Sequence, residues 1–231
     1  STGLAIVNTA GNNVPTTNTI NYHTIMTLPP ISSNLATISG YDENTCKLVG
    51  SQTISEVPVV SPFSFDPVSV RMNGKAANYT ASRLKYITTT SSTNQRLSFS
   101  YAVVLEDGAH QSSESPYFKV EVRNESTGAI LPGCTSYTFN PVSSTPSDSL
   151  KVSVTGPPSG LGAIRYRKWQ YYSVDLSTLP LTTNVSINFE VGGCAQGGHW
   201  GYAYVDAECG GIGTPYANMC SGSNFATLVA P

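Results

Sequence analysis

The sequence is poor in charge, and this excludes several kinds of partner. Only 11% of its 231 residues are Asp, Glu, Lys or Arg, whereas globular proteins average roughly 25%. The formal net charge is −2, so there is no basic surplus for nucleic acid or for an anionic membrane. No apolar run approaches the roughly 18 residues that would cross a bilayer. We therefore expect neither nucleic-acid binding nor membrane insertion, and a surface made polar by Ser, Thr, Asn, Gln and Tyr, as is typical of extracellular proteins.

Cysteine is also scarce, and none of it forms a Cys-x-x-Cys pair, which argues against a structural zinc site. The five cysteines are Cys46, Cys134, Cys194, Cys209 and Cys220. Disulfides in an oxidising compartment are the better interpretation. We expect Cys194–Cys209 as a bridge, because the residues between them look hairpin-like, although the sequence alone fixes no connectivity. The odd count leaves one thiol without an internal partner.

Signals for helices and for a serine nucleophile are lacking as well. No segment has a clear 3.6-residue period, and no Gly-x-Ser-x-Gly elbow is present. The 20 Gly, 15 Pro and 13 Tyr favour short strands and tight turns. A Ser-His-Asp triad is not excluded by composition, but no clustered acid and base can be located. The chain is therefore not expected to be an enzyme.

Alternation of apolar and polar residues predicts strands along most of the chain. The clearest cover residues 98–106, 117–123, 169–176, 184–191 and 199–206, and weaker ones cover 68–72 and 83–89. Regularly spaced short strands predict an all-β sandwich, jelly-roll-like, with long surface loops. We expect this sandwich to span residues 1–208. Residues 209–231 have weak periodicity and are expected to form a linker and the start of a following module. The opening residues STGLAIVN look like a mature or trimmed start.

The most informative stretch is GGCAQGGHWGYAYVDAECGG, residues 192–211. Its strand alternates between small residues on one face and Trp200, Tyr202 and Tyr204 on the other. With Trp169, these rings offer either a stacking surface for sugars or a packed core. Core packing between two sheets is the commoner outcome for aromatic residues at period 2.

Two histidines and two carboxylates are candidate site residues. His110 and His199 sit at glycine-flanked corners and, with Asp107, are candidates for a ligand or metal site. The alternative is that each ring only ties a loop to the sandwich. Asp107 or Asp206, with loop carbonyls, could ligate a structural Ca²⁺. The alternative for these carboxylates is hydrogen bonding to backbone amides.

Four stretches together resemble a known module. They are PVSVRMNG (67–74), LSFSYAVVLEDGAHQSSESPYFKVEV (97–122), RKWQYYSVDLS (167–177) and CAQGGHWGYAYVDAECG (194–210). Their order and content resemble a module of very large surface proteins of gliding Bacteroidota, including gliding-motility adhesins. The chain departs from that pattern at Gly108 (usually Pro), Ser115 (usually Gln), Gly193 (usually Asp) and Trp200 (usually Phe). The absence of Asp before Cys194 weighs against a carboxylate role there.

The resemblance implies an extracellular adhesin module at the cell surface, exported by the type IX secretion route and without catalytic activity. It also implies neighbouring Ig-like or PKD-like domains in the same polypeptide, because Cys220 and Leu228-Val229-Ala230-Pro231 match the opening of such a domain. Extracellular glycans or other surfaces are the expected partners, or the module spaces domains that bind them. Alternatives are a subunit of an extracellular filament and a carbohydrate-binding domain of a secreted hydrolase. Asp148-Ser149-Leu150 resembles the Bacteroidota O-glycosylation site at Ser149.

Overall fold

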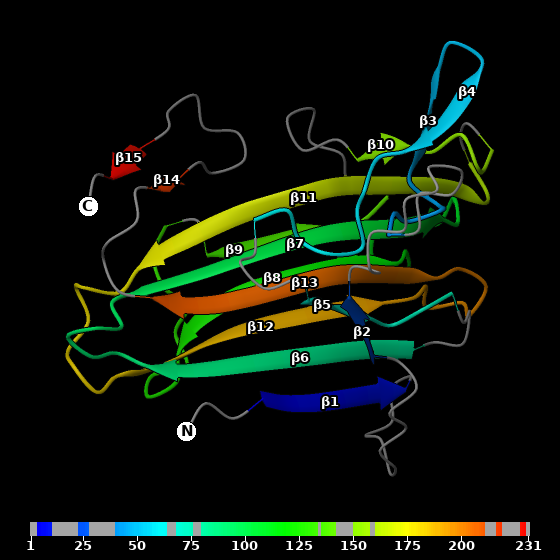
Figure 1. The fold of residues 1–231 in the computed structure, drawn as a ribbon. Coiled ribbons are helices and arrows are strands. Elements are labelled where there is room, and N and C mark those ends of the chain that lie inside the picture. Colours follow the sequence, from blue (N-terminus) through cyan, green and yellow to red (C-terminus); the bar gives the residue numbers. More distant parts are fainter. Residues whose placement is uncertain are drawn as a thin grey trace.

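The computed structural model describes residues 4–10, 23–27, 40–63, 68–75, 80–133, 135–141, 150–157, 160–210, 216–218 and 227–229. These residues form strands, turns and loops, and no helix among them is long and apolar enough to cross a membrane (Figure 1). Ser149, Cys134 and Cys220 lie outside the described residues. The all-β class predicted from the alternation is confirmed.

Two antiparallel sheets form the body of the molecule. The five-stranded sheet has the order β1 (Leu4–Ala10), β6 (Thr80–Thr89), β12 (Asn184–Gly192), β8 (Tyr117–Asn124) and β9 (Ser136–Phe139). The six-stranded sheet has the order β10 (Lys151–Val152), β11 (Ala163–Asp175), β7 (Arg96–Asp107), β13 (Gly201–Gly210), β5 (Val68–Met72) and β2 (His23–Thr27). Two small hairpins pair β3 (Cys46–Val49) with β4 (Gln52–Ser55), and β14 (Tyr216–Asn218) with β15 (Thr227–Val229).

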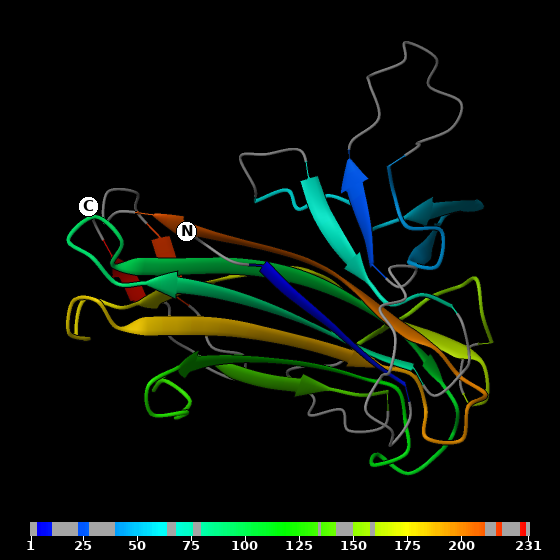
Figure 2. The same cartoon turned by 90° about the horizontal axis from the view of Figure 1, so that it is seen from below.

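The strand order is that of a jelly roll. If the eight strands β5, β6, β7, β8, β9, β11, β12 and β13 are counted one to eight, one sheet reads 1-8-3-6 and the other 2-7-4-5. The chain therefore crosses between the sheets at nearly every connection, which gives two interleaved Greek keys. The hairpin β3–β4 lies at one end of the long strands and β14–β15 at the other (Figures 1 and 2). The jelly-roll-like sandwich predicted from sequence is confirmed.

The main core lies between the two sheets. It is built from the inward side chains of β7, β8, β12 and β13, among them Phe99, Tyr101, Phe118, Phe189 and Val205, all no more than 1% exposed. β8 and β12 keep the alternation expected of strands with one face in the core. The small face of β13 also belongs to this core. A Cβ on Gly201 would come within 2.8 Å of the Leu105 side chain, so the glycine permits close packing.

A second apolar cluster lies on the outer face of the six-stranded sheet. It contains Val104 from β7, Tyr166 and Trp169 from β11, and Tyr202 and Tyr204 from β13. Residues 40–61, which include the hairpin β3–β4, cover it with Val57, Val59 and Val60. Because β7 is covered on both sides, almost every residue along it is buried. We call residues 40–61 the cover segment.

The structure corrects the predicted disulfide. Cys194 is a free, buried thiol. It lies in the loop before β13, whereas Cys209 lies near the far end of β13, where its backbone pairs with Leu97 of β7. The residues between them form a tight loop followed by one extended strand, not a hairpin. The eight steps from Gly201 to Cys209 span about 26 Å at ~3.3 Å per residue, and a disulfide needs Cα atoms within about 7 Å. The prediction of a Cys194–Cys209 bridge is therefore wrong.

Candidate functional site

The aromatic residues of β13 are packed, not displayed. Tyr202 and Tyr204 are each 2% exposed, and Trp169 is 5% exposed. The indole nitrogen of Trp169 donates to the carbonyl of Pro58 at 2.7 Å, which ties the cover segment to β11. Trp200 is half-buried and stacks on Tyr202 with 5.5 Å between the ring centroids. Tyr202, Tyr204 and Trp169 therefore form a core under the cover segment, rather than between the two sheets, and do not present an exposed platform.

One buried carboxylate holds the two tyrosines. Asp42 Oδ2 accepts hydrogen bonds from the hydroxyl groups of Tyr202 at 2.8 Å and Tyr204 at 2.6 Å. Asp42 Oδ1 accepts from the backbone N–H of Asn44 at 2.8 Å. Burial, together with the nearby Asp42 charge, raises the pKa of both phenols well above the usual range. The phenols therefore stay protonated and act as donors that anchor the cover segment.

The two aspartates proposed as alternative calcium ligands lie far apart along the six-stranded sheet. Asp107 pairs with Ala163 at the end of β7, whereas Asp206 pairs with Ser100, seven residues away along β7. Asp107 also has partners within the protein: its Oδ2 lies 2.9 Å from Arg165 Nε, and its Oδ1 accepts from the Ala109 N–H at 2.9 Å. Its role is that of an ion-paired carboxylate that fixes a turn. Asp206 is half-buried.

The structure brings His110 and His199 together and adds a residue that the sequence assigned elsewhere. His110 Nε2 lies 3.1 Å from His199 Nδ1, and His199 Nδ1 lies 3.4 Å from Cys194 Sγ. All three donor atoms lie within 4.8 Å of one another. Asp107, expected as their companion, is instead engaged by Arg165. The two rings expected to share a site therefore lie together, and the third residue beside them is Cys194 rather than Asp107.

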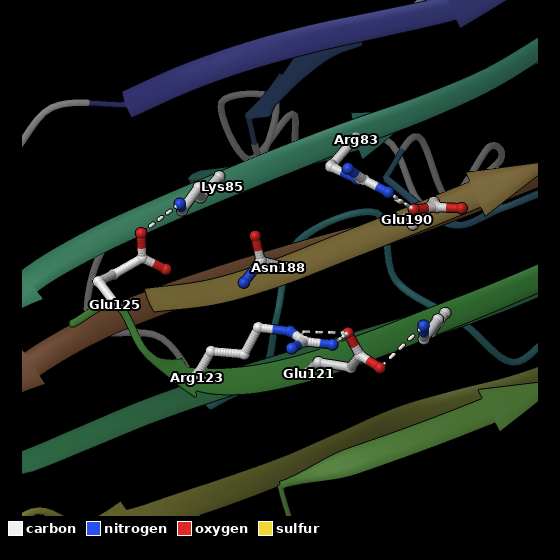
Figure 3. A pocket seen from close by; sticks show the side chains of 8 residues that line it. Arg83, Lys85, Glu121, Arg123, Glu125, Asn188 and Glu190 are labelled. Atoms are coloured by element: carbon white, nitrogen blue, oxygen red, sulfur yellow. Dashed lines mark hydrogen bonds and ion pairs between the residues drawn. The ribbon is translucent and has the colours of Figure 1, made fainter. Parts of the chain in front are cut away.

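A second candidate site lies on the outer face of the five-stranded sheet. A groove of about 310 Å³ runs over β6, β12 and β8. It is lined by outward-facing polar side chains: Arg83, Lys85, Lys119, Glu121, Arg123, Glu125, Asn188 and Glu190. Figure 3 shows Asn188 in the middle of this set, between charged groups from the two flanking strands. We call this surface the polar groove.

Charges in the polar groove alternate across neighbouring strands. The backbone register places Glu190 between Arg83 and Lys119, and Asn188 between Lys85 and Glu121. Burial raises the pKa of Glu121, but its ion pairs with Lys119 and Arg123 outweigh this and leave the pKa lowered. The same balance lowers the pKa of Glu190. The groove therefore presents fully ionised groups of both signs together with an amide.

The sequence pattern predicts the outward-facing residues of the polar groove, strand by strand, but not that these strands are neighbours. The alternation places Lys119 and Glu121 on the outward face of one strand and Asn188 and Glu190 on that of another. Which strands are neighbours depends on the jelly-roll crossovers, and these are not visible in a single sequence. Asp42 and the cover segment carried no strand pattern and were missed.

Comparison with known proteins places the chain in no family. No family model matches it, and no curated protein matches it. Among solved structures it is similar to the enzymatically active domain of tailspike protein 4 of bacteriophage CBA120, with 8% identity and a TM-score of 0.35 over 89% of this chain and 19% of the tailspike. The chain thus spans about a fifth of that protein.

Two further solved structures are similar over more of their own length. One is TmCBM61, a carbohydrate-binding module in complex with β-1,4-galactotriose, with 12% identity, a TM-score of 0.32 and coverage of 62% of this chain and 72% of that one. The other is the K1 cleaved adhesin domain of Lys-gingipain from Porphyromonas gingivalis W83, with 11% identity, a TM-score of 0.29 and coverage of 90% and 99%. With TM-scores this low, none of the three bears on what this chain binds.

Proposed function

We propose that this chain is a non-catalytic, extracellular adhesive module that binds a polar glycan in the polar groove. The observation that supports this is the groove itself: eight charged or amide side chains line a sheet face that none of the described segments covers. The low charge of the chain and its resemblance to Bacteroidota surface modules favour the extracellular setting. The residues first expected to bind sugar, Tyr202, Tyr204 and Trp169, are buried and are not part of the proposal.

The chemistry of the polar groove favours a glycan with carboxylates over a neutral one. Its eight lining residues include no aromatic ring, so a pyranose would have no platform for its C–H face. Recognition would depend on hydrogen bonds to hydroxyl groups and on charge-assisted pairs. The guanidinium of Arg123, now paired with Glu121, can pair with a sugar carboxylate in the same planar geometry. Asn188 offers a donor and an acceptor for hydroxyl groups.

The test is a glycan array probed with the folded 231-residue chain, with and without Ca²⁺, that includes uronic-acid polymers. Any glycan that binds is then titrated by calorimetry against Arg123→Ala and Asn188→Ala. We expect each change to weaken binding by about tenfold or more, the equivalent of ~1.4 kcal/mol. Lys47→Ala is the matched control, because Lys47 is a half-exposed lysine that pairs with Glu56 in the cover segment, outside the polar groove.

Two results would overturn the proposal. One is an array on which no acidic or neutral glycan binds while the chain gives a cooperative unfolding transition. The other is a glycan whose affinity is unchanged in both groove variants. Binding lost equally in Lys47→Ala would indicate a general charge effect and would also count against the polar groove.

A further inference from the structure

The cluster of His110, Cys194 and His199 lies where two crossover loops run side by side. The loop after β7 carries His110 and leads to β8, and the loop after β12 carries Cys194 and His199 and leads to β13. Each loop passes from one sheet of the sandwich to the other. Backbone and side-chain contacts join them: the Ala195 N–H donates to the Glu114 carbonyl at 2.9 Å. A ligand held by all three side chains would therefore connect both loops and both sheets.

The sulfur of Cys194 is placed as a hydrogen-bond acceptor. The backbone N–H groups of Gly198 and His199 point at Sγ from 3.3 Å and 3.2 Å. The tight loop that makes this possible is closed by the Cys194 N–H, which donates to the His199 carbonyl at 2.9 Å. These two N–H donors fix the position of Sγ beside His199 Nδ1. Cysteine sulfur is a common zinc ligand in proteins.

Hydrogen bonding among the three side chains cannot satisfy them all. A ring nitrogen carries either one hydrogen or one lone pair in the ring plane, so His199 Nδ1 makes one strong hydrogen bond at a time. Two partners nevertheless face it, His110 Nε2 at 3.1 Å and Cys194 Sγ at 3.4 Å. A cation placed among the three atoms would accept one lone pair from each of them at once.

Two of the three distances are close to the edges of a tetrahedral metal site. Zinc–nitrogen bonds of about 2.05 Å and a zinc–sulfur bond of about 2.3 Å give edges of ~3.3 Å between nitrogens and ~3.6 Å between nitrogen and sulfur. The two measured edges are 3.1 Å and 3.4 Å. One ligand atom from each of the three residues lies within 4.8 Å of the other two, so a shift of at most about 1 Å in the half-exposed His110 would close the site.

A catalytic cysteine–histidine pair is the competing interpretation. A nucleophile must meet its substrate, whereas Cys194 is 0% exposed. We propose that His110 Nε2, His199 Nδ1 and Cys194 Sγ bind a divalent transition-metal ion, zinc foremost, which clamps the two crossover loops and leaves a fourth position for water or an external donor. The lack of a Cys-x-x-Cys pair argued against a structural zinc site in the sequence. That argument does not reach this site, because its ligands come from two loops that are far apart in sequence.

Cobalt(II) is the probe, because its spectrum reports both sulfur ligation and coordination number. The reduced, chelator-treated chain is titrated with Co²⁺ and then with Zn²⁺. We expect saturation at one equivalent, a sulfur-to-cobalt charge-transfer band with the intense visible bands of a four-coordinate ion, and displacement by Zn²⁺. We also expect Zn²⁺ to raise the melting temperature and EDTA to reverse the rise, since a ligand that binds the folded state stabilises it.

Variants separate this site from other thiols and histidines. Cys194→Ser should abolish the charge-transfer band, and His110→Ala and His199→Ala should each weaken Co²⁺ binding at least tenfold. Cys46→Ser removes a second buried free thiol of the described residues, whose Sγ lies 3.3 Å from Ser55 Oγ, and should leave the spectrum unchanged. His23→Ala, which changes the third histidine of the chain, should also leave it unchanged.

Gly108 allows a test that removes no ligand. A Cβ at this position would lie 2.4 Å from His199 Nδ1 and 2.8 Å from His110 Nε2. Gly108→Ala should therefore push the rings apart and weaken Co²⁺ binding, while all three donors remain and the far-ultraviolet circular dichroism is unchanged. The proposal fails if the native chain shows no sulfur-to-cobalt band, or if the band survives in Cys194→Ser. It also fails if Gly108→Ala binds as tightly as the native chain.

Discussion

The two outer faces of the sandwich come from strands with the same alternation of inward and outward residues, but one face is buried and the other lines a groove. On the six-stranded sheet the outward residues are aromatic, and the cover segment buries them with Val57, Val59 and Val60. On the five-stranded sheet, the outward residues of β6, β12 and β8 are mostly charged, and they line the polar groove. Figures 1 and 2 show residues 40–61 on only the six-stranded side.

The difference teaches that a period-2 pattern identifies a strand but not the use of its outer face. Tyr202 and Tyr204 look like a binding platform in sequence, yet a segment more than 140 residues away in the chain covers them and holds them through Asp42. The residues of the polar groove look like an ordinary solvated strand face in the sequence, yet in the structure they line a groove of about 310 Å³. Three changes would break or sharpen this contrast.

The largest expected effect comes from releasing the cover segment. Asp42→Ala removes the acceptor of the Tyr202 and Tyr204 hydroxyl groups, and both hydroxyls lie in the buried cluster. Each unsatisfied buried group costs about 1–3 kcal/mol, so we expect a loss of about 4 kcal/mol in the free energy of unfolding, measured by urea denaturation. The matched change on the uncovered face is Glu121→Ala, which removes two ion pairs and should cost about 1 kcal/mol or less. Equal losses in the two variants would contradict the contrast.

An intermediate effect is expected at Glu56, which joins the cover segment to β11. Its side chain is 3% exposed and forms ion pairs with Lys47, Lys151 and Lys168. Burial raises the pKa of Glu56, but the hydrogen bonds from Lys168, Lys47, Tyr166 and Lys151 outweigh it and lower the pKa far below the usual range. We expect Glu56→Gln to lower the free energy of unfolding by about 2 kcal/mol at pH 7. The loss is smaller than for a fully buried ion pair, because the half-exposed lysines regain water.

The pH dependence gives Glu56 a signature of its own. In the unfolded chain the carboxyl group takes up a proton near its ordinary pKa of about 4.3, whereas in the folded chain it stays ionised to much lower pH. The contribution of Glu56 is therefore complete above about pH 5 and is lost as the pH falls toward the folded pKa, because the unfolded state then binds more protons. The native chain should lose stability more steeply than Glu56→Gln between pH 5 and pH 3. Parallel curves in urea denaturation would contradict this assignment.

The sequence carried most of the fold because most strands obey the alternation. β12 keeps it without interruption, with Val185, Ile187 and Phe189 in the main core. β11 does not, because a register shift lies between Arg167 and Gln170. The shift places Tyr166 and Trp169, three residues apart, on the same covered face, whereas regular alternation would put them on opposite faces. An extra residue in a strand leaves no mark in composition, so the faces of β11 could not be assigned from sequence.

The candidate sites were less predictable than the fold, because their residues come from segments that are far apart along the chain. His110 and His199 were found as candidates because each sits at a turn flanked by glycine. Cys194 was assigned to a disulfide, because its true neighbours depend on two loops meeting at one end of the sandwich. Asp42 was missed because nothing near it in sequence reveals that Tyr202 and Tyr204 lie above it in space.

The smallest expected effect tests whether the uncovered face stabilises the fold at all. Arg83 and Glu190 pair across β6 and β12, with side chains 54% and 23% exposed. In a double-mutant cycle with Arg83→Ala and Glu190→Ala, solvent and salt should limit the coupling energy to about 1 kcal/mol or less. Because the pair is exposed, the coupling should shrink further in 1 M NaCl, where the screening length is ~3 Å. A coupling above about 2 kcal/mol that resists salt would mean that these charges hold the sheet together. The polar groove would then be a structural lattice, and its residues would not be free to exchange their partners for a ligand.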